Sequence, residues 1–429
     1  MSQPLGALSL GIYALIIEQV ATNWCLKSAL KALSLTHRSF VPLCQKYIFS
    51  SITIPCSSPK VDTFPDILQA SPHLFDNVKS FTYDLDDTDP PAPVKARRND
   101  NTVQLLERLQ GLDALTISTP EPYEVRWNLI DARITDALLR LIHSLSLRSL
   151  HLERIRNFPK NALLQLSNSP NIKSISVSAV GIEDTAGALA PLTTIWPQLS
   201  KVSAYPRSAE AVSALVAGIS PSNPSVAQFP HLREIFTEWE DDKDMNASHQ
   251  LIGSASQLDD LFCSLSKNSM ATFEGLAASI LKGSSQTLRV VKLYTTEPDE
   301  DVDEPFLKSI PELQQLAGGK MKVLERIDMN FNLFLGDSDY SPKNLWKSIS
   351  AQSKSLDDIF ADRNAFPALR SISIYFIVSI FDDSGYENFT LVRQFHAVSK
   401  LIREKLFRNL DGIPTINLSF RLEMEWTDE

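Results

Sequence analysis

The sequence predicts an α/β protein, in which three short N-terminal helices precede an irregular, curved array of parallel strands and helices. Apolar residues at helical spacing fill the first fifty positions, and a six-residue apolar pattern recurs along the rest of the chain. Helix-compatible segments separate the copies of that pattern. We therefore expect one domain over residues 1–48 and a second over residues 49–429.

The first fifty residues predict three helices. Ile12, Leu15 and Ile16 follow helical spacing, and further helices are expected over residues 26–35 and 40–47. Helices this short do not bury their apolar faces by themselves. They are therefore either a cap on the array that follows or a docking module whose exposed stripe is completed by a partner.

The pattern apolar-x-x-apolar-x-apolar predicts the strands of the second domain. Its copies begin at Phe49, Val78, Leu112, Leu147, Ile172, Leu199, Leu232, Leu288, Leu324, Leu369 and Ile413. A proline stands shortly before several copies, as at Pro170, Pro230 and Pro367, where it ends the preceding helix and fixes the turn into the strand.

Helices are expected between these strands because apolar residues recur there at three- and four-residue spacing. The segments are 102–109, 134–145, 160–166, 209–219, 270–281 and 391–410. A strand–turn–helix unit repeated in this way is typical of a leucine-rich-repeat-like solenoid with a curved parallel sheet. An ordinary α/β fold with scattered strands is the alternative.

Residues 5–48 resemble the F-box, most closely the divergent form found at the head of many fungal proteins. The resemblance rests on residues 8–20 and 30–40, where Leu8 and Ile12 match the opening of the motif and Phe40 takes its later aromatic position. Ser9 and Gly11 replace the proline and glutamate of that opening.

The resemblance implies that the helices dock on a Skp-family adaptor and, through it, on a cullin. The residues expected to contribute to adaptor binding are Leu8, Ile12, Leu15, Ile16, Leu30, Leu33 and Phe40.

An F-box-like head joined to a leucine-rich-repeat-like body resembles the substrate-receptor subunits of cullin-based ubiquitin ligases. This implies a non-catalytic protein that holds a target on its repeat surface. Trp239 is the candidate target contact, because tryptophan is enriched at interfaces and this one follows a predicted strand. The alternative is a repeat scaffold that no longer binds an adaptor.

Composition excludes several other classes of protein. The net charge of −10 disfavours binding to nucleic acid or to anionic membranes. The four cysteines form no C-x-x-C pair, so neither a zinc site nor a disulfide scaffold is expected, and a reduced compartment, cytoplasm or nucleus, fits best. The apolar stretch near the N-terminus is interrupted by Glu18, which argues against a signal peptide or a membrane span.

Motifs of catalysis and cofactor binding are missing from the sequence. The histidines never take an H-x-x-x-H spacing, and no complete phosphate loop or nucleophile elbow occurs. No enzymatic activity, cofactor or metal is therefore expected. Acidic runs at 84–93, 238–244 and 297–304 are interpreted as solvated loops between repeats, or else as an acidic rim for a basic partner.

Overall fold

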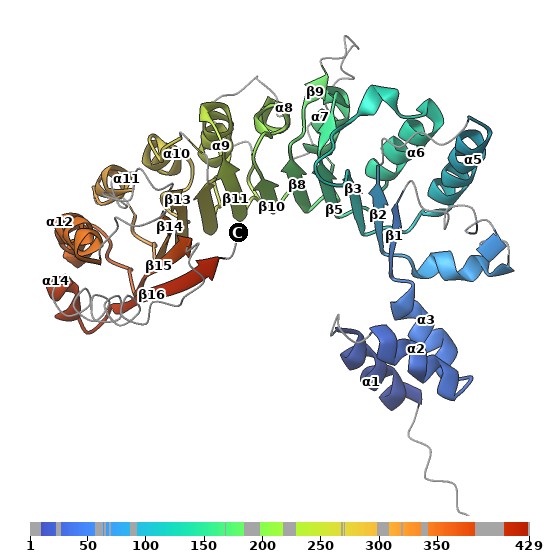
Figure 1. Ribbon diagram of the computed structural model, residues 1–429, viewed down its shortest axis with the longest axis horizontal. Coiled ribbons are helices and arrows are strands. Elements are labelled where there is room, and N and C mark those ends of the chain that lie inside the picture. Colours follow the sequence, from blue (N-terminus) through green and yellow to red (C-terminus); the bar gives the residue numbers. More distant parts are fainter. Residues whose placement is uncertain are drawn as a thin grey trace, which may run out of the picture. The chain divides into compact units, whose positions relative to one another are not determined.

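The computed structural model divides the chain into two compact units, residues 1–162 and 163–429. Its described residues are 10–22, 27–55, 63, 66–67, 70–85, 92–167, 169–183, 198–217, 229–266, 269, 271–297, 309–318, 321–335, 342–381 and 407–427. Within each unit, helices lie on one face of a run of parallel strands, so the protein is α/β (Figure 1). No helix among these residues is both long and apolar enough to cross a lipid bilayer.

Three helices open the first unit, as the apolar spacing predicts. They are α1 (Leu10–Thr22), α2 (Lys27–Thr36) and α3 (Phe40–Ile48). Ile17, Leu30 and Cys44, one from each helix, are buried together at their centre. The domain boundary expected at residues 48 and 49 falls inside this unit and stays a prediction.

The first unit continues with four strands in parallel register. They are β1 (Ser51–Pro55), β2 (Ser80–Asp84), β3 (Ala114–Ser118) and β5 (Ser149–Glu153), paired in that order. The 3-10 helix η2 (Pro72–Asn77) and the helices α5 (Ala92–Arg108) and α6 (Ala132–Ile142) connect them. Alternate strand residues are buried, as expected where helices cover one face of a sheet.

The second unit holds a longer run of parallel strands, each paired with the next. These are β8 (Ser174–Ser178), β10 (Lys201–Ala204), β11 (Glu234–Trp239), β12 (Asp260–Leu265), β13 (Val290–Glu297), β14 (Arg326–Leu335), β15 (Ser371–Phe381) and β16 (Asn417–Thr427). This confirms the prediction of a long parallel sheet.

Helices alternate with these strands. They are α8 (Ala209–Ala217), α9 (Asp242–Ser254), α10 (Leu276–Gly283), α11 (Ile310–Leu316), α12 (Pro342–Ala361) and α14 (Arg408–Asp411), while α7 (Lys160–Ser167) begins at the end of the first unit. The segments expected to be helical over 160–166 and 209–219 match α7 and α8. The segment 270–281 becomes helical only from Leu276, and most of 391–410 lies outside the described residues.

One strand, β12, is missing from the sequence prediction. Its pattern is nevertheless complete: Leu258, Leu261 and Cys263 take the three apolar positions and all three are buried. This copy divides the long interval between the copies at Leu232 and Leu288 almost in half. Burial raises the pKa of the Cys263 thiol to about 12, so this cysteine behaves as a core side chain.

Candidate functional site

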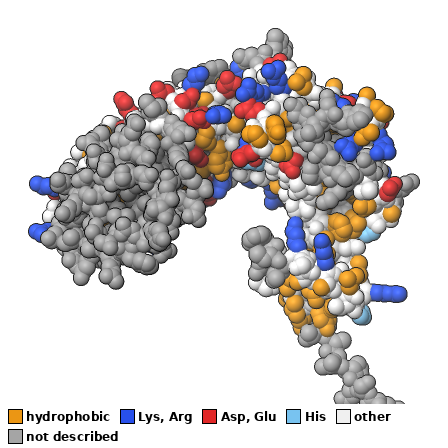
Figure 2. Space-filling model, viewed as in Figure 1, with side chains coloured by type: hydrophobic (Ala, Val, Ile, Leu, Met, Phe, Trp, Pro, Cys, Tyr) orange, Lys and Arg blue, Asp and Glu red, His pale blue; other side chains and the backbone are white. Residues whose placement is uncertain are grey.

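An exposed apolar stripe lies on α1. Ile12, Leu15 and Ile16 are all exposed, Leu15 to 66% of its surface, and they share one helix face because they stand three and four residues apart. Figure 2 shows hydrophobic side chains gathered over the N-terminal helices. A stripe of large aliphatic side chains facing solvent costs hydration free energy, which a partner covering it would recover.

The other predicted adaptor-binding residues take a different role. Leu30 is buried in the small core of the three helices, and Leu33 and Phe40 pack against that core. The Phe40 ring also contacts the ring of Tyr13, with centroids 4.9 Å apart. These side chains hold the helices together and leave the α1 stripe outside, whereas Leu8 lies outside the described residues.

Trp239, the candidate target contact, is a core residue, and the expectation of surface exposure is wrong. It ends β11 on the same side of the strand as Ile235 and Thr237, and all three side chains are buried. Its ring contacts His249 at 5.3 Å and Phe273 at 5.7 Å between centroids. Burial lowers the pKa of His249 to about 4, in keeping with an apolar pocket around the indole.

The acidic run 238–244 is likewise not a solvated loop. It crosses from the end of β11 into the first turn of α9, where Asp241 accepts hydrogen bonds from the backbone N–H groups of Lys243 and Asp244. Asp244 itself is buried. Asp241 and Asp242 remain exposed, so an acidic rim at this place stays a prediction, and residues 298–308 lie outside the described residues.

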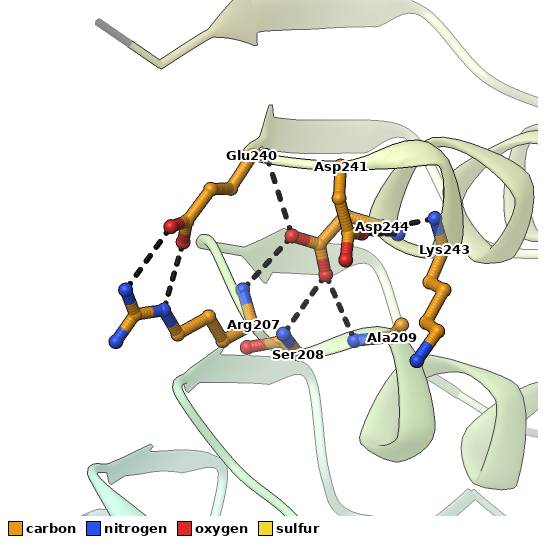
Figure 3. A network of polar contacts seen from close by, with 7 residues as sticks. All are labelled: Arg207, Ser208, Ala209, Glu240, Asp241, Lys243 and Asp244. Atoms are coloured by element: carbon orange, nitrogen blue, oxygen red, sulfur yellow. Dashed lines mark hydrogen bonds and ion pairs between the residues drawn. The ribbon is translucent and has the colours of Figure 1, made fainter. Parts of the chain in front are cut away.

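Asp244 joins two neighbouring helices (Figure 3). Its carboxylate accepts from the backbone N–H of Arg207 at 2.9 Å and from those of Ser208 and Ala209 at 3.0 Å, at the start of α8. The left-handed backbone at Arg207 (φ 62°) turns these N–H groups toward one point. The Arg207 guanidinium pairs with Glu240 at 2.9 Å, outside the buried contact.

Two further carboxylates in the second unit accept hydrogen bonds from backbone N–H groups at the start of a neighbouring helix. The carboxylate of Glu312, in α11, accepts from Gly275 and Ala277 at the start of α10. Asp357, in α12, accepts from Asn409 and Leu410 at the start of α14. Buried carboxylates thus accept hydrogen bonds from the N–H groups that have no partner at a helix start. Each of them joins that helix to a neighbouring helix of the second unit.

A row of aromatic side chains crosses the strands of the second unit. Tyr205 directly follows β10, and Phe236, Phe262 and Tyr294 lie on β11, β12 and β13. The centroids of successive rings are 5.0, 4.4 and 5.7 Å apart. All four are half-buried and alternate along their strands with core residues. They therefore occupy the sheet face opposite the helices.

A hollow of about 380 Å³ opens beside this row. Phe262, Tyr294, Asn330 and Tyr375 contribute to its lining. Asn330 stands in register with Tyr294 on one side and with Tyr375 on the other, so a short polar side chain separates two tyrosines. Sequence periodicity does not reveal this site, because alternation identifies the core residues of a strand and leaves the opposite face undetermined.

Charged side chains around the hollow are paired with one another. Lys292 lies 2.7 Å from Asp260, Arg326 lies 2.8 Å from Asp328, and Arg421 pairs with Glu423. Arg421 also lies over the ring of Tyr375, 5.6 Å from its centroid, and the Tyr375 hydroxyl donates to Glu423. The lining therefore combines aromatic side chains with charged side chains that are held in ion pairs.

Within the part of the chain that the structure describes, no group of three or more His, Cys, Asp or Glu side chains is placed to hold a metal ion. No protein-family model matches the sequence, and no curated protein matches it at a significant level. The candidate sites are therefore two surfaces, the α1 stripe and the hollow on the sheet face.

Proposed function

We propose that this chain is the substrate-recognition subunit of a ubiquitin ligase of the Skp/cullin/F-box type. Its N-terminal helices would dock on a Skp-family adaptor and, through it, on a cullin, while the strand–helix array holds a target protein. The chain would perform no chemistry itself. It would act by raising the effective concentration of the target beside the ubiquitin-conjugating machinery.

The observation that carries this proposal is the exposed stripe of Ile12, Leu15 and Ile16 beside an already packed core of three helices. A cap would bury its apolar stripe against the array that follows. These three side chains instead face solvent, which favours a docking helix that a partner covers. The F-box-like order of features in residues 5–48 supplies the class of partner.

The long run of parallel strands supports the second half of the proposal. We take the array to be an irregular leucine-rich-repeat-like solenoid, because each apolar sextet forms a strand and helices alternate with the strands. Regular leucine-rich repeats are held by a ladder of asparagine side chains, whereas here buried carboxylates such as Asp244 join the starts of α8, α10 and α14 to neighbouring helices.

Titration of the full chain with a purified Skp-family adaptor tests the proposal. Leu15→Asp places a charge in the centre of the stripe, and we expect it to weaken adaptor binding at least ~10-fold, equivalent to about 1.4 kcal/mol. The matched control is Leu145→Asp, because Leu145 is also an exposed leucine, 80% accessible, in the turn after α6. Equal loss in both variants would contradict docking through α1.

The second candidate function is a repeat scaffold that has lost adaptor binding. Gly11 lies in the first turn of α1, which contains no acidic residue, so the helix start lacks the stabilisation that a glutamate gives. Wild-type protein that binds no Skp-family adaptor in the same titration would favour this alternative.

A further inference from the structure

Glu238 lies beside the aromatic row on the sheet face. It stands on β11 two residues after Phe236, so the two side chains share one face of the strand. The register of β10 and β11 pairs Ala204 with Thr237, and the next step of that register brings Tyr205 beside Glu238. The rings of Tyr205 and Phe236 have their centroids 5.0 Å apart. A carboxylate therefore adjoins two neighbouring aromatic rings.

The Glu238 carboxylate forms no ion pair or hydrogen bond with any residue that the structure describes. Other carboxylates on this sheet face do have a cation. Glu234 lies 3.0 Å from Lys201, and Asp260 lies 2.7 Å from Lys292. Both lysines are therefore already paired, and Glu238 is left without a cation of its own.

This carboxylate is unfavourable in the chain without a ligand. Glu238 is half-buried, and burial raises the pKa of its carboxyl group. Removing a carboxylate from water without giving it a hydrogen bond or a cation costs free energy. A cation bound beside Glu238 recovers that cost, whereas an apolar ligand increases it. The site therefore favours a positively charged ligand.

We propose that Glu238 and the rings of Tyr205 and Phe236 bind an arginine side chain of a partner protein. A guanidinium group is planar, so it stacks on an aromatic ring and donates two parallel hydrogen bonds to a carboxylate. A ring attracts a cation within about 6 Å of its centroid, and neighbouring strands lie about 4.8 Å apart, so one guanidinium reaches both ring and carboxylate. A lysine ammonium is more strongly hydrated and has no fork of donors, so this half-buried site suits it less well.

A basic segment also suits the charge of the whole chain. The net charge of −10 attracts positively charged partners and repels acidic ones. An acidic segment would place a second carboxylate beside Glu238, which already lacks a cation. We therefore expect the partner to present its arginine from a segment of net positive charge.

The inference rests on the proposed function only in that the partner would then be the ubiquitination target. Glu238 lies in the second unit and the α1 stripe in the first, so Leu15→Asp should leave arginine binding unchanged. A chain that binds arginine peptides but no adaptor would contradict the proposed function alone. A chain that binds the adaptor but shows no preference for arginine would contradict this inference alone.

A random peptide library displayed on phage and panned against the full chain tests the inference, with counter-selection on Glu238→Gln. That variant keeps the size of the side chain and removes its charge. We expect enriched peptides to carry arginine, and synthetic copies to bind wild type at least ~10-fold more tightly than Glu238→Gln. Glu234→Gln is the matched control, because Glu234 stands on the same face of β11 but already pairs with Lys201. It should change binding less than ~2-fold.

Substitutions in the selected peptides separate charge from shape. Citrulline has the shape of arginine without its charge, so it should bind wild type at least ~10-fold more weakly and bind wild type and Glu238→Gln about equally. Lysine should bind about 3- to 10-fold more weakly than arginine. Tyr205→Leu removes one ring and should weaken arginine binding about 3-fold.

Thermal unfolding of Glu238→Gln shows whether a loss of binding reflects a loss of structure. Because the carboxylate has no partner within the described fold, we expect this variant to unfold at the temperature of wild type or above it. Four results would overturn the inference: no enrichment of arginine, equal loss of binding in both glutamine variants, lysine peptides bound as tightly as arginine peptides, or an unfolding temperature of Glu238→Gln below that of wild type.

Discussion

Asp131 in the first unit and Asp244 in the second both stabilise the start of a helix, in opposite surroundings. Asp131 precedes α6 and accepts from the backbone N–H of Arg133 at 2.9 Å, with further contacts to the side chains of Arg133 and Asn99. Asp244 reaches from α9 to the start of α8, where its carboxylate accepts from backbone N–H groups.

The pKa values of the two carboxyl groups move in opposite directions. Hydrogen bonds from the Arg133 side chain lower the pKa of Asp131 to about 2, from an ordinary 3.8. Burial raises the pKa of Asp244 despite the N–H groups that favour its ionised form. The ionised form of a carboxylate that caps its own helix near solvent is therefore favoured, whereas that of a carboxylate buried between two helices is disfavoured by its surroundings.

The largest effect is expected from Asp244→Ala. It leaves the N–H groups of Arg207, Ser208 and Ala209 without their acceptor, that of Ser208 in a buried place, which should cost about 3 kcal/mol of stability around α8. Asp244→Asn keeps one acceptor oxygen and should cost only about 1 kcal/mol. Hydrogen exchange of the α8 amides, followed by mass spectrometry, measures the local opening free energy of each variant.

The control for Asp244 is Asp242→Ala, which removes an exposed carboxylate from the first turn of the same helix. We expect that change to cost less than about 1 kcal/mol, the usual value of a charge near a helix end. Equal protection of α8 in Asp244→Ala and wild type would show that the carboxylate does not join the two helices.

A smaller effect is expected on the pH dependence of stability, to which Asp131 and Asp244 should contribute with opposite signs. Because the folded pKa of Asp131 is lowered, its ionisation stabilises the fold above about pH 3.8, and this contribution is lost as the pH falls through about 2. Asp244 has a raised folded pKa, so its contribution has the opposite sign: it is present below about pH 3.8 and is lost as the pH rises through the folded pKa.

Urea unfolding of wild type, Asp131→Asn and Asp244→Asn across this acidic range measures both contributions. On acidification, wild type should lose stability relative to Asp131→Asn and gain it relative to Asp244→Asn. We expect a change of about 1 kcal/mol for the Asp131 contribution and a change of the opposite sign for the Asp244 contribution. Parallel pH profiles for all three proteins would contradict the assignment of opposite surroundings.

Periodicity predicted much of the fold, because the burial of alternate strand residues leaves a direct record in the sequence. The apolar sextets place most strands, and the helical spacing places α1, α2 and α3. Two regions depart from the prediction. The copy of the pattern that ends at Cys263 is absent from the predicted strands although β12 forms there, and the acidic run 238–244 enters helix α9 instead of forming a solvated loop.

The candidate sites were predictable only in part. Helical spacing identifies a stripe on α1 but does not separate exposed Leu15 from Leu30, since that depends on how the three helices pack. Trp239 looks accessible beside its acidic neighbours, yet strand alternation places it in the core. The hollow at Asn330 requires the registers of β13, β14 and β15, and these are set by pairing across long sequence separations.

The smallest effect is expected at the start of α1, which has no aspartate of the kind found at α6 or α8. Gly11 is exposed in the first turn of α1, and no acidic residue stands there. Gly11→Ala should stabilise α1 by about 0.5–1 kcal/mol, because glycine loses more backbone entropy on folding. Gly11→Glu should add a few tenths of a kcal/mol through the positive helix end.

Amide exchange within α1 measures both variants, and adaptor titration shows whether the more stable helix binds more tightly. Slower exchange in Gly11→Glu than in Gly11→Ala would establish the charge effect, while identical exchange would assign the whole gain to backbone entropy. Exchange in either variant as fast as in wild type would show that this glycine does not limit the stability of α1.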